Sequence, residues 1–449
     1  MIKRGSEITG NVTAYNANGL GIIDYHGDSI LVKDVLVGET IKVKIEHKVK
    51  EGYYAKVFKL IKSSSWRTKV SCPYFARCGS CDYLYLLYAY ELKNKQEDVL
   101  NLIKRSGLKI KCNEVVGMDK PIAYRNKCII TFKTDKELIA GFYAANSHQV
   151  ININHCELHD DKTNELIKII KQVVKKCRLD IYDENTNRGF LKHVLIRRGF
   201  NTDQTLITLV TSTKEFRGKK NFIEQLTKAT KSIGGIVQNV NSRRTSIVLG
   251  DEEIRLYGSP YIYDELLGLK FKISSKSFYQ INHEQCEKLY TKALELAEIN
   301  SNDVVVDTYC GIGTISLLAA KQAKKVYAVE INRDAIKDAK NNAEINQIDN
   351  VEFTNADAGQ YMIGLAQRHT KIDVVIMDPA REGSDDAFID ALKRLKPKKI
   401  VYISCNPETQ MRDLNKLKDT YRFKEVFPFD MFPRTKHVET VVLMSRVKG

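Results

Sequence analysis

The stretch DVVVDTYCGIGT, residues 303–314, determines how the C-terminal third of the chain folds. Three consecutive valines favour a buried strand, and the two glycines that follow favour a tight turn. The pattern predicts a strand over 303–308, a glycine-rich turn, and a helix through Ala320. A strand that turns on glycines directly into a helix is typical of nucleotide-binding α/β domains.

From about residue 268 onward, strand-like and helix-like segments alternate, which predicts a parallel sheet. The further strands are expected at 325–329, 351–354, 372–377, 399–404 and 439–444. Ligands of open α/β sheets bind outside the carboxyl ends of the strands. Functional side chains are therefore expected directly after each of these strands.

Acidic residues follow the second, third and fourth expected strands of this sheet. The glycine turn lacks the third glycine of G-x-G-x-x-G, which argues against a tightly held pyrophosphate and favours an adenosine ligand without phosphates. Glu330 is placed to bind the ribose hydroxyls, and Asp357 to meet the adenine amino group. With Asp378 after the fourth strand, this order indicates a binding site for S-adenosyl-L-methionine. An NAD-type enzyme is the alternative, which the incomplete fingerprint disfavours.

Cys405 follows the strand at 399–404 and precedes Asn406-Pro407, which starts a turn. A thiol at a strand tip is well placed to act as a nucleophile. The alternative is a buried structural cysteine, because free cysteines are among the most buried residues. This stretch alone does not separate the two interpretations.

The methyl acceptor has to explain both Asp378-Pro379 and Cys405. Methylation of an amine needs no cysteine, whereas methylation at carbon 5 of a pyrimidine does, because that carbon is a poor nucleophile in the intact ring. A thiolate that adds to carbon 6 activates carbon 5 towards the sulfonium methyl group. A base must then remove the carbon 5 proton, and Glu439, where the last strand begins, is our candidate. Without Cys405, Glu439 would be interpreted as an ordinary carboxylate at a strand end.

The N-terminal sixty residues predict a small barrel similar to an OB fold. Its strands are expected at 8–15, 19–25, 29–33, 40–47 and 53–61. The second half is rich in lysine, with Tyr53, Tyr54 and Phe58 among the lysines, which suits a surface that stacks bases and pairs phosphates. Alternatively, these aromatic residues form the barrel core.

Three cysteines, Cys72, Cys78 and Cys81, follow with the spacing C-x5-C-x2-C. Cys156 is the best candidate for a fourth ligand, although His155 or His159 could replace one thiol. Four thiolates hold zinc or an iron–sulfur cluster. The spacing differs from the paired C-x2-C of a zinc ribbon, so we favour a 4Fe-4S cluster over zinc.

The middle third reads as mixed α+β, with helices expected at 83–106, 165–177 and 222–233 and strands at 192–198 and 205–211. Residues 236–241 and 246–249 resemble a hairpin. The net charge of +16 favours a polyanionic partner, most often nucleic acid. The sequence has no long apolar run and no signal-peptide pattern, so we expect a cytoplasmic protein that does not enter the membrane.

Together these motifs resemble the RNA uracil-5-methyltransferases, in particular the 23S rRNA (uracil-5-)-methyltransferases, over essentially the whole chain. The signatures that carry the resemblance are DPAREG at 378–383, SCNP at 404–407 with Thr409, DMFP at 430–433 and HVE at 437–439. The fold that we expect is a class I (Rossmann-like) S-adenosylmethionine methyltransferase domain with an N-terminal OB-like barrel and a central α+β domain. We expect the domain boundaries at 1–62, 63–265 and 266–449.

The resemblance also implies the roles of single residues. It implies Cys405 as the nucleophile, Glu439 as the base and Phe278 as a neighbour of the target base. The residues that it implies for contacts with the methyl donor are Gln280, Tyr309, Glu330 and Asp378. It identifies the barrel as a TRAM domain and the four cysteines as ligands of a 4Fe-4S cluster.

The resemblance implies 23S ribosomal RNA as the partner, and we predict no obligate protein partner. Two alternatives stay open. One is the transfer-RNA branch of the same chemistry. The other is a non-catalytic iron–sulfur protein that binds RNA, against which the paired presence of Cys405 and Glu439 argues.

Overall fold

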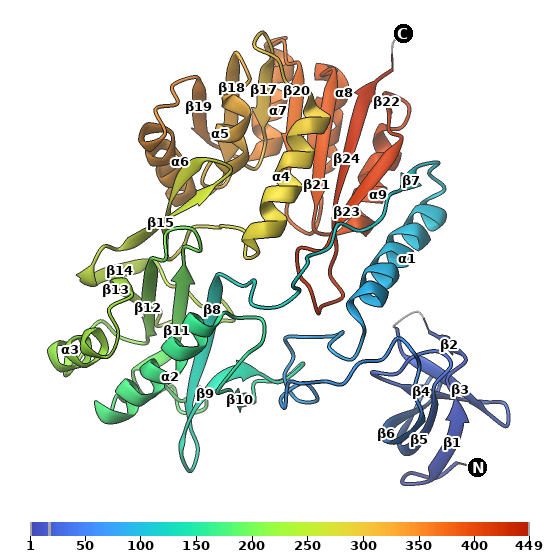
Figure 1. Cartoon of the computed structure of the whole chain (residues 1–449). Coiled ribbons are helices and arrows are strands. Elements are labelled where there is room, and N and C mark those ends of the chain that lie inside the picture. Colours follow the sequence, from blue (N-terminus) through green and yellow to red (C-terminus); the bar gives the residue numbers. More distant parts are fainter. Residues whose placement is uncertain (1, 17–18, 448–449) are drawn as a thin grey trace. The chain divides into compact units, whose positions relative to one another are not determined.

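The computed structural model describes residues 2–16 and 19–447, which form two compact units (Figure 1). The smaller unit comprises the N-terminal segment through Ala76, Ser80–Glu91 and Arg434–Lys436. The larger unit comprises Arg77–Gly79, Leu92–Pro433 and the C-terminal segment from His437. No helix in the described part of the chain is long and apolar enough to cross a membrane.

The smaller unit contains the OB-like barrel, whose strands run in the order β1-β5-β6-β4-β3-β2. Their bounds are β1 (Glu7–Asn11), β2 (Ala14–Tyr15), β3 (Gly21–Tyr25), β4 (Asp28–Val32), β5 (Thr40–Val49) and β6 (Gly52–Lys62). The expected first strand is divided into β1 and β2, and the other expected strands are confirmed. Buried aliphatic side chains such as Ile23, Ile30 and Ile41 fill the core.

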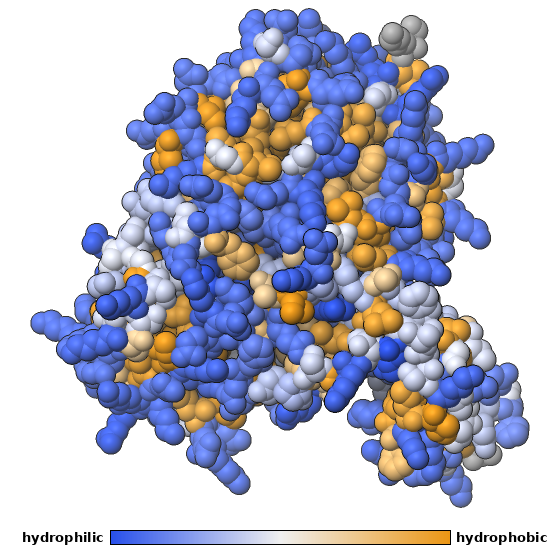
Figure 2. Space-filling view, in the orientation of Figure 1, coloured by the Kyte–Doolittle hydropathy of each residue, from blue (hydrophilic) through white to orange (hydrophobic). Residues whose placement is uncertain are grey.

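The aromatic residues of β6 divide between the core and the surface. Tyr53 packs in the barrel core, whereas Phe58 is 62% exposed. Val57, Leu60 and Ile61 are also exposed on the same strand. Figure 2 shows an apolar area on the barrel among hydrophilic side chains. Of the two interpretations of these aromatics, the core holds for Tyr53 and the surface for Phe58.

A buried ion pair fixes the segment that follows the barrel. The Glu39 carboxylate is fully buried and accepts hydrogen bonds from Arg67 Nε at 2.5 Å and Nη2 at 2.8 Å. The backbone N–H groups of Leu36 and Ser64 also donate to it, at 2.9 and 3.3 Å. The serine-rich segment that follows β6 is therefore bonded to the barrel.

The central region of the larger unit is an α+β layer with the sheet order β10-β9-β8-β11-β12-β13-β14. Its strands are β8 (Lys127–Thr134), β9 (Leu138–Tyr143), β10 (Val150–Asn152), β11 (Leu191–Arg198), β12 (Thr205–Thr211), β13 (Ile233–Val240) and β14 (Glu252–Gly258). The helices α2 (Asp161–Lys176) and α3 (Lys219–Ala229) share one hydrophobic core with β8 and β11–β13. They therefore cover the same face of the sheet.

Two expectations for the middle third were wrong in detail. The helix expected from residue 83 is α1 (Tyr88–Ser106), which begins five residues later. The expected hairpin partner at 246–249 is not a strand, and β13 pairs with β14 instead. Asn241 Nδ2 donates to the carbonyls of Ile247 and Val248 at 2.8 and 2.9 Å, so its side chain holds this segment as a loop.

The C-terminal region is built on a sheet with the order β19-β18-β17-β20-β21-β24-β23-β7, with β22 attached to β24. The strands are β7 (Lys111–Cys112), β17 (Val304–Asp307), β18 (Lys325–Glu330), β19 (Val351–Asn355), β20 (Val374–Met377), β21 (Lys399–Ser404), β22 (Tyr421–Arg422), β23 (Glu425–Phe429) and β24 (Glu439–Arg446). The strands expected in this third are confirmed to within a few residues at either end. The chain reverses its direction of growth between β17 and β20, which is the switch point where ligands of such sheets bind.

Helices cover both faces of this sheet (Figure 1). They are α4 (His283–Ala297), α5 (Thr314–Ala320), α6 (Arg333–Ile345), α7 (Ala358–Gln367), α8 (Asp386–Leu395) and α9 (Pro407–Leu417). Val305 packs in the core with α4 and α5, whereas Val306 packs in the core with α7, α8 and α9. Because successive side chains of a strand point to opposite faces, the valine run is what a strand buried on both sides requires.

A hairpin of β15 (Tyr261–Leu266) and β16 (Leu269–Ser274) connects the two regions of the larger unit. The free edge of β16 is bonded to α6 through two asparagines one turn apart. Asn342 Oδ1 accepts from Lys272 N at 2.7 Å, and Asn346 Oδ1 accepts from Lys270 N at 2.9 Å. The segment that follows β16, residues 275–282, is thereby anchored where it starts.

Candidate active site

The predicted functional residues lie along one edge of the C-terminal sheet. Met377 at the end of β20 pairs with Tyr402 of β21, and Ser404 at the end of β21 pairs with Thr440 of β24. Asp378 therefore follows the end of β20, and Cys405 follows the end of the adjacent β21. Because β24 is antiparallel and begins at Glu439, that carboxylate lies at the same edge as the thiol.

The strand register places Cys405 and Glu439 as next neighbours beyond the last ladder pair. Residues directly opposite each other on antiparallel strands have Cβ atoms about 5 Å apart. Glu439 also pairs with Phe429 of β23 on its other side, so both neighbouring strands fix its backbone. Two side chains far apart in the sequence are thus brought together by pairing of the backbone alone.

A short loop fixes the backbone around the thiol. Asn406 caps α9, with its Oδ1 accepting from Glu408 N at 3.2 Å and Pro407 in the first turn. Asn406 Nδ2 and Thr409 Oγ1 both donate to Arg381 O, at 2.9 and 3.1 Å. These bonds join the segment after β20 to the segment after β21.

The charges around Cys405 disfavour its thiolate in the structure as it stands. Cys405 is half-buried, and burial together with the negative charges of Glu439 and Asp378 raises the pKa of its thiol to about 11. The nearby Arg381 guanidinium acts in the opposite direction. The thiol is therefore protonated at neutral pH until a change in its surroundings favours the anion.

Glu439 and Asp378 form a pair of coupled carboxyls. Glu439 is 3% exposed, its Oε2 has no hydrogen-bond partner among the residues described, and burial raises its pKa to about 7. Burial, and then the charges of Glu439 and Asp307, raise the pKa of Asp378 well above its ordinary value. Burial and mutual repulsion thus favour retention of a proton on this pair near neutral pH.

The glycine turn lies at the same edge of the sheet, directly after β17. Gly311 and Gly313 have φ values of +54° and +85°, a backbone region that glycine adopts without strain. Gly311 N donates to Glu330 Oε2 at 3.2 Å, which links the turn to the tip of β18. Ser316 stands where the third glycine of a dinucleotide fingerprint would be, and its Oγ donates to Asp307 Oδ2 at 2.6 Å. The departure from the fingerprint therefore has a structural role.

The remaining donor residues predicted from the sequence lie around this turn. Tyr309 follows β17 and is half-buried against Phe388, with a ring-centroid distance of 5.9 Å. Asp357 is exposed and caps α7, its Oδ1 accepting from Gln360 N at 3.0 Å. Gln280 is 6% exposed and hydrogen-bonds through its side chain with Tyr290 of α4. Tyr309 and Asp357 thus lie just after the strands that the sequence indicates, β17 and β19, whereas Gln280 lies in the 275–282 loop before α4.

The 275–282 loop combines a buried backbone with one exposed aromatic ring. Phe278 is 65% exposed, whereas its neighbours Ser277 and Tyr279 are buried. Ser277 Oγ donates to Asp338 Oδ2 of α6 at 2.7 Å. Asn282 ends the loop as the cap of α4, and its Nδ2 donates to Met431 O at 3.1 Å. The loop therefore contacts both the α6 side and the 430–433 signature.

Sequence reasoning missed several residues of the site. Asp307 is 1% exposed, and burial raises its pKa to about 6. Its place at the head of the glycine turn was a usable signal. Cys286 and Tyr290 are buried on one face of α4, and the Glu439 and Asp378 charges reach Cys286. No sequence motif marks these two, because only the packing of α4 turns them towards the site.

Ile331 is another missed residue. It follows Glu330 at the tip of β18 and is 71% exposed, the largest exposure among the large hydrophobic side chains described. An exposed apolar side chain beside the carboxylate of Glu330 is suited to contact the flat face of a bound ring. Its position directly after the acidic strand tip was the available sequence signal.

The four candidate cluster cysteines are divided between the two units. Cys72 and Cys81 belong to the smaller unit, and Cys78 and Cys156 to the larger. Asn164 holds the backbone of Cys156 on both sides, since its Oδ1 accepts from Cys156 N at 2.8 Å and its Nδ2 donates to Cys156 O at 3.1 Å. Over the residues that the structure describes, no group of three or more His, Cys, Asp or Glu side chains is arranged to hold a metal ion. The donor chemistry suits a cluster, but the arrangement does not identify one.

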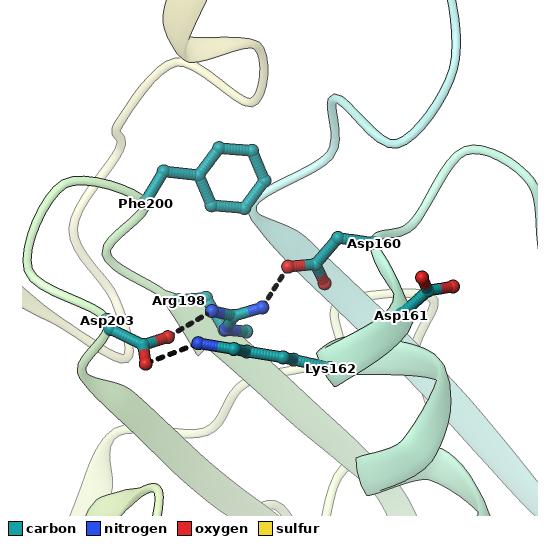
Figure 3. A pocket seen from close by; sticks show the side chains of 6 residues that line it. All are labelled: Asp160, Asp161, Lys162, Arg198, Phe200 and Asp203. Carbon is teal, nitrogen blue, oxygen red and sulfur yellow. Dashed lines mark hydrogen bonds and ion pairs between the residues drawn. The ribbon is translucent and has the colours of Figure 1, made fainter.

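A separate cavity of about 540 Å³ lies in the central region (Figure 3). Arg198 lies between Asp160 and Asp203, bonding to both, with Asp203 Oδ1 at 2.5 Å from Nη2. Lys162 Nζ lies 2.5 Å from the other oxygen of Asp203. Two cations, Lys162 and Arg198, thus face three carboxylates, and Asp161 takes part in none of these ion pairs.

Comparisons with known proteins agree with this geometry. A family model described as tRNA (Uracil-5-)-methyltransferase matches residues 88–447. An uncharacterized RNA methyltransferase of Halalkalibacterium halodurans is 40% identical over 433 residues, which are 95% of this chain and 94% of that protein. A second one, from Staphylococcus aureus, is 40% identical over 441 residues, 97% of each chain.

A solved structure resembles the whole chain as well. The tRNA (uracil-54, C5)-methyltransferase of Pyrococcus abyssi, in complex with S-adenosyl-L-homocysteine, has a TM-score of 0.79 and 27% identity. The match covers 97% of this chain and 99% of that one. The chain therefore belongs to the tRNA (uracil-5-)-methyltransferase family, and it is an S-adenosylmethionine-dependent RNA (uracil-5-)-methyltransferase.

Proposed function

We propose that Cys405 is the nucleophile and Glu439 the base of this methylation. The observation that carries the proposal is the strand register, which makes the two residues neighbours just beyond the Ser404–Thr440 pair. Asp378 lies at the same edge, at the end of the adjacent strand. A nucleophile and a base within reach of one ring are what methylation at carbon 5 requires.

The steps follow from the chemistry of uracil. The Cys405 thiolate adds to carbon 6, which forms a carbon–sulfur bond and places the negative charge on an enolate. Carbon 5 then takes the methyl group, and the bond between that methyl and the sulfonium breaks to leave S-adenosylhomocysteine. Glu439 removes the proton from carbon 5, and the electrons of that bond expel the Cys405 sulfur from carbon 6.

The protonation states of the site suit these roles. A base is most useful when its pKa is near the operating pH, and that of Glu439 is raised to about 7. The Cys405 thiol, with its pKa raised to about 11, has to lose its proton when RNA binds. Arg381 is the cation that favours this loss.

The donor and the target base occupy opposite parts of the edge in this proposal. Glu330 binds the ribose hydroxyls, Asp357 binds the adenine amino group, and Gln280, Tyr309 and Asp378 hold the methionine part and the reacting base. Two observations support this division: Gly311 and Glu330 are hydrogen-bonded to each other, and Ile331 beside them is exposed. Phe278, exposed on the 275–282 loop, stacks on a uridine that has left its helix.

For the substrate we propose uridine in 23S ribosomal RNA, and an RNA substrate favours the cytoplasm as the place of the reaction. The resemblance of the sequence signatures supports the ribosomal substrate. Transfer RNA is the second candidate, which the similarity to the Pyrococcus abyssi enzyme favours. In either case the net charge of +16 supports binding to phosphates, which makes the affinity depend on salt.

The domains expected from the sequence divide the work in this proposal. Residues 1–62 form a TRAM barrel that binds RNA, 63–265 the central domain with the cluster, and 266–449 the methyltransferase domain. The exposed Phe58 among the lysines of β6 supports an RNA-binding barrel, since exposed aromatics and cations suit stacked bases and phosphates.

The proposal includes a 4Fe-4S cluster bound by Cys72, Cys78, Cys81 and Cys156, which supports structure and takes no part in the methylation steps. The spacing of the four cysteines supports it. Protein purified without oxygen should contain iron and acid-labile sulfide and absorb visible light, and Cys156→Ser should lose these signals. Cys177→Ser is the matched control. Wild-type protein that contains no iron and no acid-labile sulfide after purification without oxygen would refute the cluster.

The experiment that tests the function is a nucleoside analysis. Protein is incubated with labelled S-adenosylmethionine and with unmodified transcripts of 23S ribosomal RNA and transfer RNA. We expect 5-methyluridine in the ribosomal transcript. Its appearance only in transfer RNA would keep the mechanism and overturn the substrate, and absence from both would overturn the proposal.

A further inference from the structure

The 275–282 loop carries two side chains with different proposed tasks, Phe278 for the target base and Gln280 for the donor. They lie only two residues apart, yet Phe278 is 65% exposed and Gln280 is 6% exposed. An exposed ring has no packing of its own to fix its direction. Its placement therefore depends on how firmly the backbone beside it is held.

Arg197, the penultimate residue of β11, holds the first half of this loop. Its side chain is buried, and its Nε and Nη2 donate to Ser275 O at 3.4 and 3.3 Å. Its Nη2 also donates to Ser277 O, directly before Phe278. The Ser275 hydroxyl adds a bond of 2.8 Å to Thr208 of β12.

The surroundings of Arg197 are unusual for a cation. Its hydrogen bonds go to main-chain carbonyls, and burial lowers its pKa to about 10, an effect that the Glu253 charge partly offsets. A buried charge is costly for folding unless it is well paired. A guanidinium offers a rigid fork of donors that can fix two carbonyls at once, which no neutral side chain of this size does.

Asn126 holds the second half of the loop independently. Its side chain is 4% exposed, and its Nδ2 donates to Gln280 O at 2.8 Å. Its backbone N–H donates to Ile281 O at 3.0 Å. Arg197 and Asn126 contact different carbonyls, so either one can be removed without directly releasing the other half of the loop.

We propose that the loop has two separate clamps: Arg197 positions Phe278 against the target base, and Asn126 positions Gln280 against the methyl donor. Both act through the backbone and are positioning residues. The inference rests on the proposed roles of Phe278 and Gln280. It predicts that removal of one clamp impairs the RNA step and removal of the other impairs the donor step.

Arg198 provides a matched control. It follows Arg197 in the same strand, so its side chain points to the opposite face of the sheet. There it bonds to Asp160 and Asp203 (Figure 3). Arg198→Gln removes a buried guanidinium from the same strand without touching a loop carbonyl.

The test measures two readouts on the full chain: the covalent adduct that forms with S-adenosylmethionine and an RNA transcript that contains 5-fluorouridine, and the binding of S-adenosylhomocysteine alone. Fluorine at carbon 5 blocks removal by a base, so the covalent RNA adduct of an active enzyme accumulates on a denaturing gel. Arg197→Met should slow adduct formation about 100-fold, the usual effect of a misplacement of about 1 Å, and leave the Kd for S-adenosylhomocysteine within about twofold. Asn126→Ala should do the reverse and weaken binding of the donor product.

Arg197→Lys keeps the charge and one donor group, so its rate of adduct formation should lie between those of Arg197→Met and the wild type. It also serves as the test variant if Arg197→Met does not fold. The two-clamp inference would be overturned if Arg197→Lys and Asn126→Ala impaired the adduct rate and the binding of S-adenosylhomocysteine equally. It would also be overturned if neither Arg197 variant changed the adduct rate. A wild-type protein that forms no adduct would overturn the proposed function itself. Arg198→Gln should match the wild type in both readouts.

Discussion

Two groups of carboxylates in the larger unit have opposite surroundings. At the sheet edge, Asp378 and Glu439 are packed against each other's charge, and the pKa of each is raised. In the central cavity, Asp160 and Asp203 lie on either side of Arg198, and the hydrogen bond from Lys162 is the chief cause that lowers the pKa of Asp203. Near neutral pH the first group favours retention of a proton, whereas the lowered pKa of Asp203 keeps that carboxylate charged.

The difference shows which charges are available for chemistry. A carboxylate paired with a guanidinium keeps its charge and is held in a fixed orientation, which suits a structural role. A buried carboxyl that lacks a cation can exchange a proton near the working pH, which suits a general base. The cavity is the more obvious hollow, yet the sheet edge is the place where proton transfer is possible.

Cys405→Ala gives the largest expected effect. Without the thiol no adduct to carbon 6 forms, so methyl transfer to RNA should fall by about 10⁴-fold or more. Binding of S-adenosylhomocysteine and of RNA should be retained. Labelled-methyl transfer measures the loss of activity, and a denaturing gel measures the loss of the covalent adduct. Cys177→Ala, which removes a thiol at the end of α2, is the control, and turnover by Cys405→Ala would end the nucleophile assignment.

Glu439→Gln should separate the two halves of the reaction. The adduct can form and take the methyl group, but the carbon 5 proton stays, so product release should fall about 10² to 10⁴-fold. A covalent complex with ordinary uridine RNA should therefore accumulate, which the wild type does not show. Asp203→Asn is the control from the paired group. Normal release by Glu439→Gln would assign the base to another residue.

The sequence predicted the edge of the sheet better than its surroundings. The valine run, the glycine turn and the acidic strand tips are local signals, and they led to Glu330, Asp378 and Cys405 directly. Glu439 could be predicted only through the chemistry that Cys405 requires. Its proximity depends on the antiparallel pairing of β21 with β24, which no local pattern encodes.

Other parts of the site had no local signal at all. No local pattern marks Arg197, because its carbonyl partners lie in a loop far away in the sequence. Cys286 and Tyr290 form no motif and reach the site only through the packing of α4. The hairpin expected at 246–249 failed because an Asn241 side chain took the place of a strand partner.

The pH dependence of the unfolding free energy tests whether Glu439 is buried without a cation. Glu439 is ordinarily half-ionised at pH 4.5, and burial raises its pKa to about 7. Between these values the unfolded chain loses the proton that the folded protein keeps, so folding is progressively disfavoured as the pH rises. Glu439→Gln should remove this effect and be more stable than the wild type above pH 7, by up to about 3 kcal/mol at 1.36 kcal/mol per pKa unit.

Urea unfolding at several pH values measures this difference. The advantage of Glu439→Gln should disappear below the ordinary pKa, where both states of the wild type are protonated. Asp203→Asn should show the opposite sign, because the pKa of Asp203 is lowered in the folded protein and its stabilising effect is present at neutral pH. Equal pH profiles for Glu439→Gln and the wild type would mean that Glu439 is not buried as an unpaired acid.

The smallest effect is expected in the paired group. Arg198→Gln leaves Asp160 and Asp203 without their shared cation, so we expect a loss of about 1 to 3 kcal/mol in unfolding free energy, with methylation unchanged. Lys162→Ala removes only an exposed partner, with 60% of its side chain in solvent, and should cost less than about 1 kcal/mol. Urea unfolding and methyl transfer, measured on the same preparations, distinguish stability from activity. If Arg198→Gln lost activity while its stability held, the central cavity would take part in the reaction, and pairing of charges would no longer separate structure from chemistry in this protein.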